Sequence, residues 1–136
     1  MAKSKLYGMT KDETFYTKDE IKHRLNDDYI RGLIEGEGCF GTHRNYYGEE
    51  IPAFVLAMHA RDKEMLEAIV DYLDLPDRVY DYRHNGRHYV KFQVRDIGDL
   101  KNIIIPLFKN KLLGHKGTQL AAWLKKYPYL EGLHQK

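Results

Sequence analysis

The sequence has little of several residue types on which common protein chemistries depend. Cys39 is the only cysteine among 136 residues, which excludes an intramolecular disulfide framework and a zinc site built from several thiolates. Ser4 is the only serine and lies in the polar N-terminal stretch, so a serine-based catalytic triad lacks a suitable nucleophile. The 7 histidines are scattered rather than set at the spacing of metal ligands. We therefore expect neither a disulfide scaffold, a thiolate zinc protein nor a serine hydrolase.

Long apolar runs are missing as well. No segment is apolar enough to span a bilayer, and the first residues lack the apolar stretch of a secretion signal. Together with the single cysteine, these absences predict a protein of the cytoplasm, or of an organelle if an organelle genome encodes it, without membrane contact. The length predicts one folded domain at 17–136, preceded by a polar N-terminal arm at 1–16.

The segment from Tyr29 to Phe40 is the most informative part of the chain. Gly32 and Gly36 lie four residues apart and so stack on one side of a helix, where the missing side chains let a second helix approach closely. We predict a helix pair whose contact face consists of Ile30, Gly32, Leu33 and Gly36.

Two acids end this helical pattern. Glu35 and Glu37 fall at the helix C-terminus, where the helix dipole disfavours an anion. A cation must therefore compensate them, either a bound metal or a neighbouring lysine or arginine. Both alternatives remain open for Glu37, whereas a structural role in capping or ion pairing is the preferred interpretation of Glu35.

The remaining pattern alternates helices with pairs of strands. We expect helices at 17–25, 27–37, 62–73, 96–107 and 118–127, and strands at 40–47, 52–59, 78–84 and 87–94. Asn85-Gly86 between the last two strands is a strong hairpin signal. This order predicts an α+β domain with an αββαββα core, an antiparallel sheet and helices on one sheet face.

One face of that sheet is rich in hydrogen-bond donors. The net charge of +2 says little about nucleic acid, because the distribution of charge matters more than its sum. Alternation turns polar, basic and tyrosine side chains to the face away from the helices, which suits DNA phosphates and base edges, although a solvated sheet face has a similar composition. The predicted DNA contacts are His43, Asn45, Tyr47, His59, Tyr80, Tyr82, His84, Arg87, Tyr89 and Lys91, with Arg83 added if a bulge turns it outward.

Residues 30–38 read I-R-G-L-I-E-G-E-G, which resembles the motif of the LAGLIDADG homing endonucleases, and the resemblance extends over roughly residues 27–128. It implies a saddle-shaped antiparallel sheet that binds a long, nearly palindromic DNA duplex. Since only one copy of the motif is present, it also implies a homodimer. Arg31 replaces the usual alanine, which is harmless if its side chain points away from the paired helix.

The resemblance further implies a mechanism, the hydrolysis of phosphodiester bonds in double-stranded DNA with divalent metal ions. Glu37 and the backbone carbonyl of Gly36 are the expected ligands of Mg²⁺, for which Mn²⁺ can substitute. Lys111 is the preferred catalytic lysine, and Lys109 and Lys116 are expected to contact DNA instead. Ala60 stands where relatives often carry a water-organising group, which leaves Arg61 as the candidate for that role.

Two other functions remain open. A relative of the same fold that no longer cleaves, such as an RNA maturase or a DNA-binding regulator, is favoured by Ala60. A dimeric scaffold without a nucleic-acid partner is the second alternative. No feature predicts a small-molecule substrate.

Overall fold

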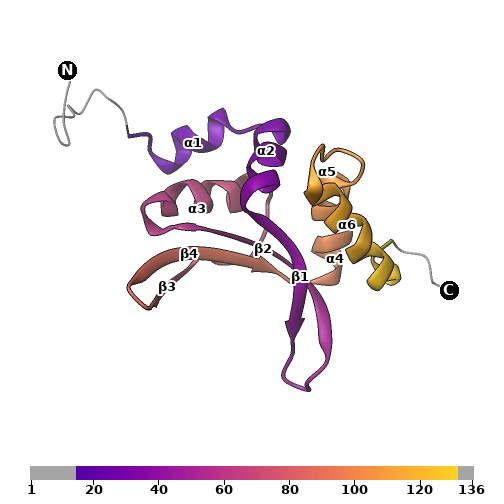
Figure 1. The fold of residues 1–136 in the computed structure, drawn as a ribbon. Coiled ribbons are helices and arrows are strands. Elements are labelled where there is room, and N and C mark those ends of the chain that lie inside the picture. The colour runs from indigo at the N-terminus through magenta and orange to yellow at the C-terminus, as the bar shows by residue number, and fades with distance from the viewer. Residues whose placement is uncertain (1–14, 132–136) are drawn as a thin grey trace.

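The computed structural model describes residues 15–131, in which helices cover one face of a four-stranded antiparallel sheet (Figure 1). The strands are β1 (Gly38–Arg44), β2 (Glu50–His59), β3 (Tyr80–His84) and β4 (Arg87–Val94), hydrogen-bonded in the order β1-β2-β4-β3. The helices are α1 (Lys18–Arg24), α2 (Asp27–Glu37), α3 (Lys63–Tyr72), α4 (Ile97–Asp99), α5 (Ile105–Phe108) and α6 (His115–Lys126). The predicted α+β fold is confirmed.

Residues 1–14, most of the predicted N-terminal arm, lie outside the described residues. Between residues 15 and 131, none of the helices has the length and apolar character needed to traverse a lipid bilayer.

Polar side chains begin the first two helices where the sequence predicts them. The Thr17 N–H donates to Glu20 Oε1 at 2.8 Å and the Glu20 N–H donates to Thr17 Oγ1 at 3.2 Å, a reciprocal capping box. At the start of α2, Asn26 Oδ1 accepts from the Tyr29 N–H at 2.7 Å. Each such cap is worth about 1 kcal/mol, because it satisfies a backbone donor that the helix leaves free.

The end of α2 passes into β1 without a loop. Gly38 closes the helix with its N–H on the Ile34 carbonyl and is also the first residue of β1. A Cβ at this position would lie 2.6 Å from Cγ2 of Ile34, which is 1% exposed. The missing side chain therefore lets β1 start directly at the end of the helix, so Glu37 immediately precedes the first residue of the strand.

Aromatic side chains make up the centre of the core between sheet and helices. The Phe54 ring lies 5.4 Å from that of Phe40 and 5.6 Å from that of Phe108 on α5 (centroid distances). Trp123 of α6 is buried against Phe40, and its Nε1 donates to the Gly41 carbonyl at 2.7 Å. These contacts attach α5 and α6 to the sheet beside α2.

The helix predicted at 96–107 forms, but its hydrogen bonding changes midway. A π-helical segment, Leu100–Ile104, joins α4 to α5, and the Ile105 N–H bonds to the Leu100 carbonyl. Pro106 accounts for this widened turn, because proline has no N–H and its ring clashes with the carbonyl four residues earlier in an α-helix.

Both hairpins form, although three of the four strands begin two residues away from the predicted boundaries. Asn85 and Gly86 have φ values of 50° and 79°, the left-handed pair that a two-residue hairpin turn requires, so this turn is confirmed. In the first hairpin, β1 ends at Arg44 rather than at 47, because the Asn45 side chain organises a loop. Likewise α6 starts at His115 rather than at 118.

Candidate nucleic-acid interface

The sheet face opposite the helices carries no carboxylate in the described strands. Tyr80 pairs with Lys91, Tyr82 with Tyr89 and His84 with Arg87, so the face predicted for the second hairpin is correct. We call this surface the open face; its side chains are Cys39, His43, Ile51, Ala53, Val55, Ala57, His59, Tyr80, Tyr82, His84, Arg87, Tyr89, Lys91 and Gln93.

Cations and tyrosine rings alternate on the β3–β4 half of the open face. The Tyr82 and Tyr89 rings stack with centroids 5.3 Å apart and planes 15° from parallel. Lys91 Nζ lies 4.9 Å from the centre of the Tyr82 ring, and Arg87 Cζ lies 5.5 Å from that of Tyr89. The rings hold both positive groups at the surface, where they are available to phosphates or base edges.

A groove of about 680 Å³ connects this half of the sheet to the end of the motif helix. Its lining includes Glu37 at one end, the apolar side chains of Val55 and Ala57 on its floor, and Lys91 and Arg87. The carboxylate of the motif thus shares one concave surface with the donors of the open face, although they lie far apart in sequence.

Glu37 fits an oxygen-ligand cation site better than it fits an ion pair. It is the exposed last residue of α2, the last turn of α2 contains no basic residue, and within residues 15–131 it has no salt-bridge partner. The carbonyl of Gly36 belongs to the last turn, whose carbonyls have no partner inside the helix. A carboxylate oxygen and a carbonyl oxygen are suitable ligands for Mg²⁺, so Glu37 and Gly36 fit the metal ion that the sequence predicts.

One copy of the chain does not supply a complete set of metal ligands. Among the described residues, no three His, Cys, Asp or Glu side chains are grouped so that they could hold a metal ion. Further ligands would therefore come from water, from phosphate oxygens or from a second copy of the chain.

Glu35 holds the turn that contains Lys111 against the end of α2. Its carboxylate accepts the Leu113 N–H at 2.5 Å and the Gly114 N–H at 3.2 Å, just before α6 begins. The structural role expected for Glu35 is confirmed. Lys111 is exposed in this anchored turn, and Lys116 lies in the first turn of α6.

The glycine side of α2 is open to solvent. A Cβ built at Gly32 or Gly36 meets no atom within 4 Å, and Leu33 beside them is half-buried. The Arg31 side chain points elsewhere, since its Nε donates to the Leu107 carbonyl at 2.8 Å. Arg31 therefore does not obstruct this side of the helix.

The assignment of Ile30 to the contact face of the helix pair was wrong. Ile30 is 1% exposed and belongs to the core of its own protomer together with Ile34. The two residues lie four apart and form the sheet-facing side of α2, while Gly32 and Gly36 lie on another side.

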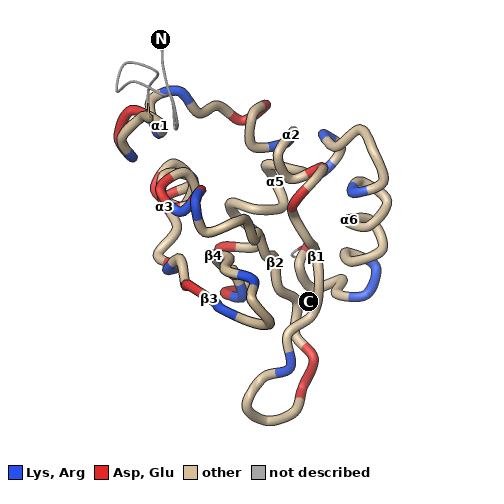
Figure 2. Tube along the Cα trace, turned by 60° about the vertical axis from the view of Figure 1, so that its left-hand side comes forward, with Lys and Arg blue, Asp and Glu red and all other residues tan. Residues whose placement is uncertain are grey.

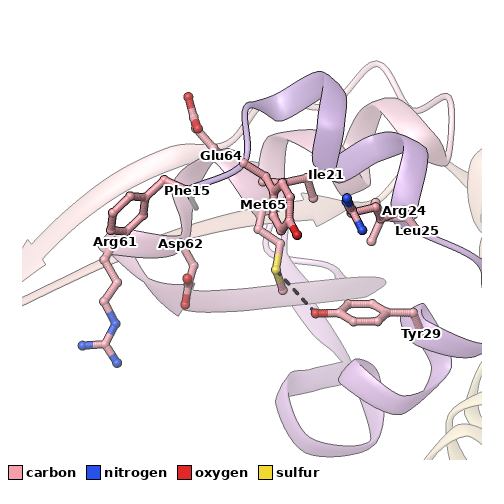
Figure 3. A pocket seen from close by; sticks show the side chains of 10 residues that line it. Phe15, Ile21, Arg24, Leu25, Tyr29, Arg61, Asp62, Glu64 and Met65 are labelled. Carbon is pink, nitrogen blue, oxygen red and sulfur yellow. Dashed lines mark hydrogen bonds between the residues drawn. The ribbon is translucent and has the colours of Figure 1, made fainter. Parts of the chain in front are cut away.

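Arg61 is not brought to Glu37. It belongs to the short 3-10 helix Ala60–Asp62 and lines a different hollow of about 420 Å³, which also contains Tyr29 and Met65 (Figure 3). The groove with Glu37 has no Arg61 in its lining. The chain turns away from the sheet directly after His59, whose Nδ1 accepts from the Arg61 N–H at 3.0 Å. The position is therefore unsuited to organising water near Glu37.

Other predicted DNA-binding residues are bonded within the protomer. Asn45 Oδ1 accepts from the N–H groups of Tyr47 and Glu49 at 2.9 and 3.0 Å, so this side chain shapes the first hairpin loop. The Tyr47 side chain remains 82% exposed on that loop. Lys109 forms an ion pair with Glu131.

Arg83 lies on the helix-side face, because the β3–β4 ladder contains no bulge: Arg83 pairs with His88 and Asp81 with Val90. The Asp81 carboxylate has a partner on this face in Lys63 Nζ at 2.7 Å. The hydrogen bond from Lys63 holds the pKa of Asp81 below its usual value.

Arg95 and Gln93 extend the set of donors beyond the predicted list. Gln93 pairs with Val55 on the open face, and Arg95 follows β4 on the same side, where its Nη1 lies 2.7 Å from His43 Nε2. The alternation that assigned Lys91 to this face already includes Gln93 within the predicted strand, and it would have identified Arg95 had it been continued past Val94.

Acidic and basic residues adjoin on the helices, for instance on α1 and α3 (Figure 2). On β3 and β4, in contrast, the open face carries Arg87 and Lys91 and no acid, because Asp81 lies on the helix side. The groove is therefore lined by the basic residues Arg87 and Lys91 and by one acidic residue, Glu37. The small net charge of the chain does not reveal this distribution.

Comparison with known proteins identifies relatives of one kind. The family model for LAGLIDADG endonuclease matches residues 30–127. A probable intron-encoded DNA endonuclease 1 from Mycosarcoma maydis is 31% identical over 86 residues, which is 62% of this chain and 31% of the relative. A probable intron-encoded endonuclease 2 from Neurospora crassa is 32% identical over 126 residues, 82% of this chain and 27% of the relative. The chain thus spans about a third or less of these relatives' lengths.

Among solved structures, the homing endonuclease I-GzeII in complex with its DNA target is similar, with a TM-score of 0.66 and 26% sequence identity. The match covers 79% of this chain and 37% of that protein.

Proposed function

Because this chain belongs to the LAGLIDADG endonuclease family, we propose that it is a homing endonuclease that cuts both strands of a long, nearly palindromic DNA site as a homodimer. The observation that carries the proposal is the position of Glu37, exposed and without an ion pair in the described chain, at the end of a donor-rich groove. The names of the relatives support it, since two are described as probable intron-encoded endonucleases.

DNA binding is assigned to the open face. Its tyrosines, histidines and basic side chains donate hydrogen bonds, and a two-stranded ribbon such as β3–β4 has the dimensions of the major groove. No acid on the described strands of this face would repel phosphate. The solved structure of I-GzeII in complex with its DNA target supports DNA binding.

The second protomer is assigned to the glycine side of α2. Gly32 and Gly36 present backbone without side chains to solvent, and a second α2 related by two-fold symmetry would cover them. Pairing there would bring two Glu37 side chains together at the symmetry axis, each at the end of its own groove. Both strands of one duplex would then lie within reach of an acidic end.

Glu37 and the Gly36 carbonyl would hold Mg²⁺ or Mn²⁺. When bound, such an ion stabilises charge on the phosphate and lowers the pKa of a coordinated water. Glu35 keeps the turn with Lys111 next to this end of α2 through its bonds to Leu113 and Gly114. Lys111 would supply the positive charge near the reacting phosphate, as its lack of a salt-bridge partner within residues 15–131 allows.

The test is cleavage of a plasmid that carries the DNA sequence flanking the gene's own insertion site. Wild-type protein is expected to cut it with Mg²⁺ and to bind without cutting with Ca²⁺. Glu37→Gln should keep binding and lose cutting by about a hundredfold or more, because the variant loses a charged metal ligand. Arg31→Gln on the same helix serves as a matched control. Full activity in Glu37→Gln would remove this residue from the mechanism.

A relative that binds nucleic acid without cutting it is the second candidate. The observation that favours it is the end of β2, where Ala60 has no polar group and lies outside the groove, and where Nδ1 of the groove-lining His59 already accepts from the Arg61 N–H. In the same plasmid assay this candidate predicts tight, salt-sensitive binding with no cleavage in either metal ion.

A further inference from the structure

His43 and Arg95 meet on the open face across the width of β2. His43 comes from β1 and Arg95 directly follows β4, yet Arg95 Nη1 lies 2.7 Å from His43 Nε2. On β2, the open-face residues nearest to the pair are Ile51, which is the cross-strand partner of His43, and the small Ala53, which is 1% exposed. Two long side chains can therefore join above the strand.

This contact fixes which nitrogen of the histidine ring carries the proton. A guanidinium group has N–H donors and no acceptor, so His43 Nε2 must accept the hydrogen bond and must be unprotonated. The single ring proton then lies on Nδ1, which has no hydrogen-bond partner among residues 15–131. The neutral ring and the free N–H groups of Arg95 together offer donors only.

We propose that the His43–Arg95 pair reads guanine in the major groove of the bound DNA. The inference rests on the proposed function, since it assigns a base to the same open face. Guanine presents two acceptors there, N7 and O6, and no donor, whereas adenine and cytosine present amino groups that need an acceptor and thymine presents one acceptor, O4, beside a methyl group. The pair has no free acceptor, because its only one is used by Arg95.

A base edge suits this pair better than a phosphate does. The ring is neutral when it accepts from Arg95, so it adds no charge toward a phosphate. The hydrogen bond to His43 restricts the orientation of the Arg95 guanidinium group, which an unpaired arginine could turn toward the DNA phosphates. A fixed pair of donors is suited to the fixed pair of acceptors on one base.

The experiment is selection of bound sequences from a randomised duplex library in Ca²⁺, with the full chain. Wild-type protein should enrich a site with guanine at one position of each half. His43→Phe and Arg95→Met should both lose this preference by about fivefold to a hundredfold, the range for one base contact, while the remaining positions stay enriched. Arg44→Met, which changes the neighbouring residue on the other sheet face, should leave the guanine in place.

Three outcomes would overturn the assignment. Guanine retained in both variants would show that other residues read it, and equal weakening on all sequences would show a phosphate contact. A wild-type protein that enriches no sequence would overturn the proposed function and this assignment with it.

A second measurement needs no DNA. Long-range ¹H–¹⁵N spectra of the histidine rings should show His43 protonated at Nδ1 in the wild-type chain, and Arg95→Met should remove that preference. A His43 ring protonated at Nε2 in the wild-type chain would refute the donor-only pair, whatever the protein binds.

Discussion

Substitution of Gly32 by alanine should stabilise the protomer and weaken the dimer. Gly32 lies inside α2, and a Cβ there meets no atom within 4 Å. Alanine is favoured over glycine in a helix interior by about 0.8–1 kcal/mol, so the protomer should gain roughly that free energy of unfolding. Nothing within the described protomer opposes this gain.

The same methyl group should act in the opposite direction on the helix pair. A two-fold dimer would bring two added methyl groups into the contact, and overpacking costs about 1–3 kcal/mol for each. The sum of about 2–6 kcal/mol corresponds to a dissociation constant about thirtyfold to twenty-thousandfold higher. Gly36→Ala should weaken the dimer similarly but stabilise the protomer less, because Gly36 is next to the last residue of α2.

Sedimentation over a range of protein concentrations measures the dissociation constant. Urea unfolding at several concentrations separates the two effects, because only the dimer term depends on concentration. Ala122→Leu is the control, since Ala122 is an exposed residue of α6 away from the glycine side of α2. A Gly32→Ala chain that dimerises as tightly as wild type, or a wild-type chain that stays monomeric, would refute the pairing of α2.

Three further predictions concern the fold and the open face. Gly38→Ala should lower the free energy of unfolding by about 1–3 kcal/mol in urea titrations, because its Cβ would lie 2.6 Å from Ile34. Burial and the nearby Asp99 raise the pKa of Asp77, so the folded state binds the proton more tightly and the free energy of unfolding falls as pH rises from the unfolded pKa through the folded one. Asp77→Asn should remove that fall and raise the melting temperature above this pH window; a parallel shift at every pH would contradict it. Lys91→Gln should reduce the salt slope of DNA binding by about one, and an unchanged slope would mean that Lys91 contacts no phosphate.

The sequence by itself determined the order of elements and most of the open face. Asn85-Gly86 specifies a two-residue turn through its left-handed backbone, and once that turn is set, alternation decides which side each residue of β3 and β4 faces. The glycines of α2 and the acid Glu37 were identified in the same way, because helical spacing is a local property of the chain.

Only the tertiary structure decided what each of these residues contacts. Ile30 has the same spacing to Gly32 in any helix, but the position of the sheet decided that it is buried in its own protomer. Arg61 lies away from Glu37 because the chain turns after His59, and Arg95 reaches His43 because β1 and β4 both pair with β2. Long-range pairing of this kind depends on packing across the whole sheet, which no local pattern encodes.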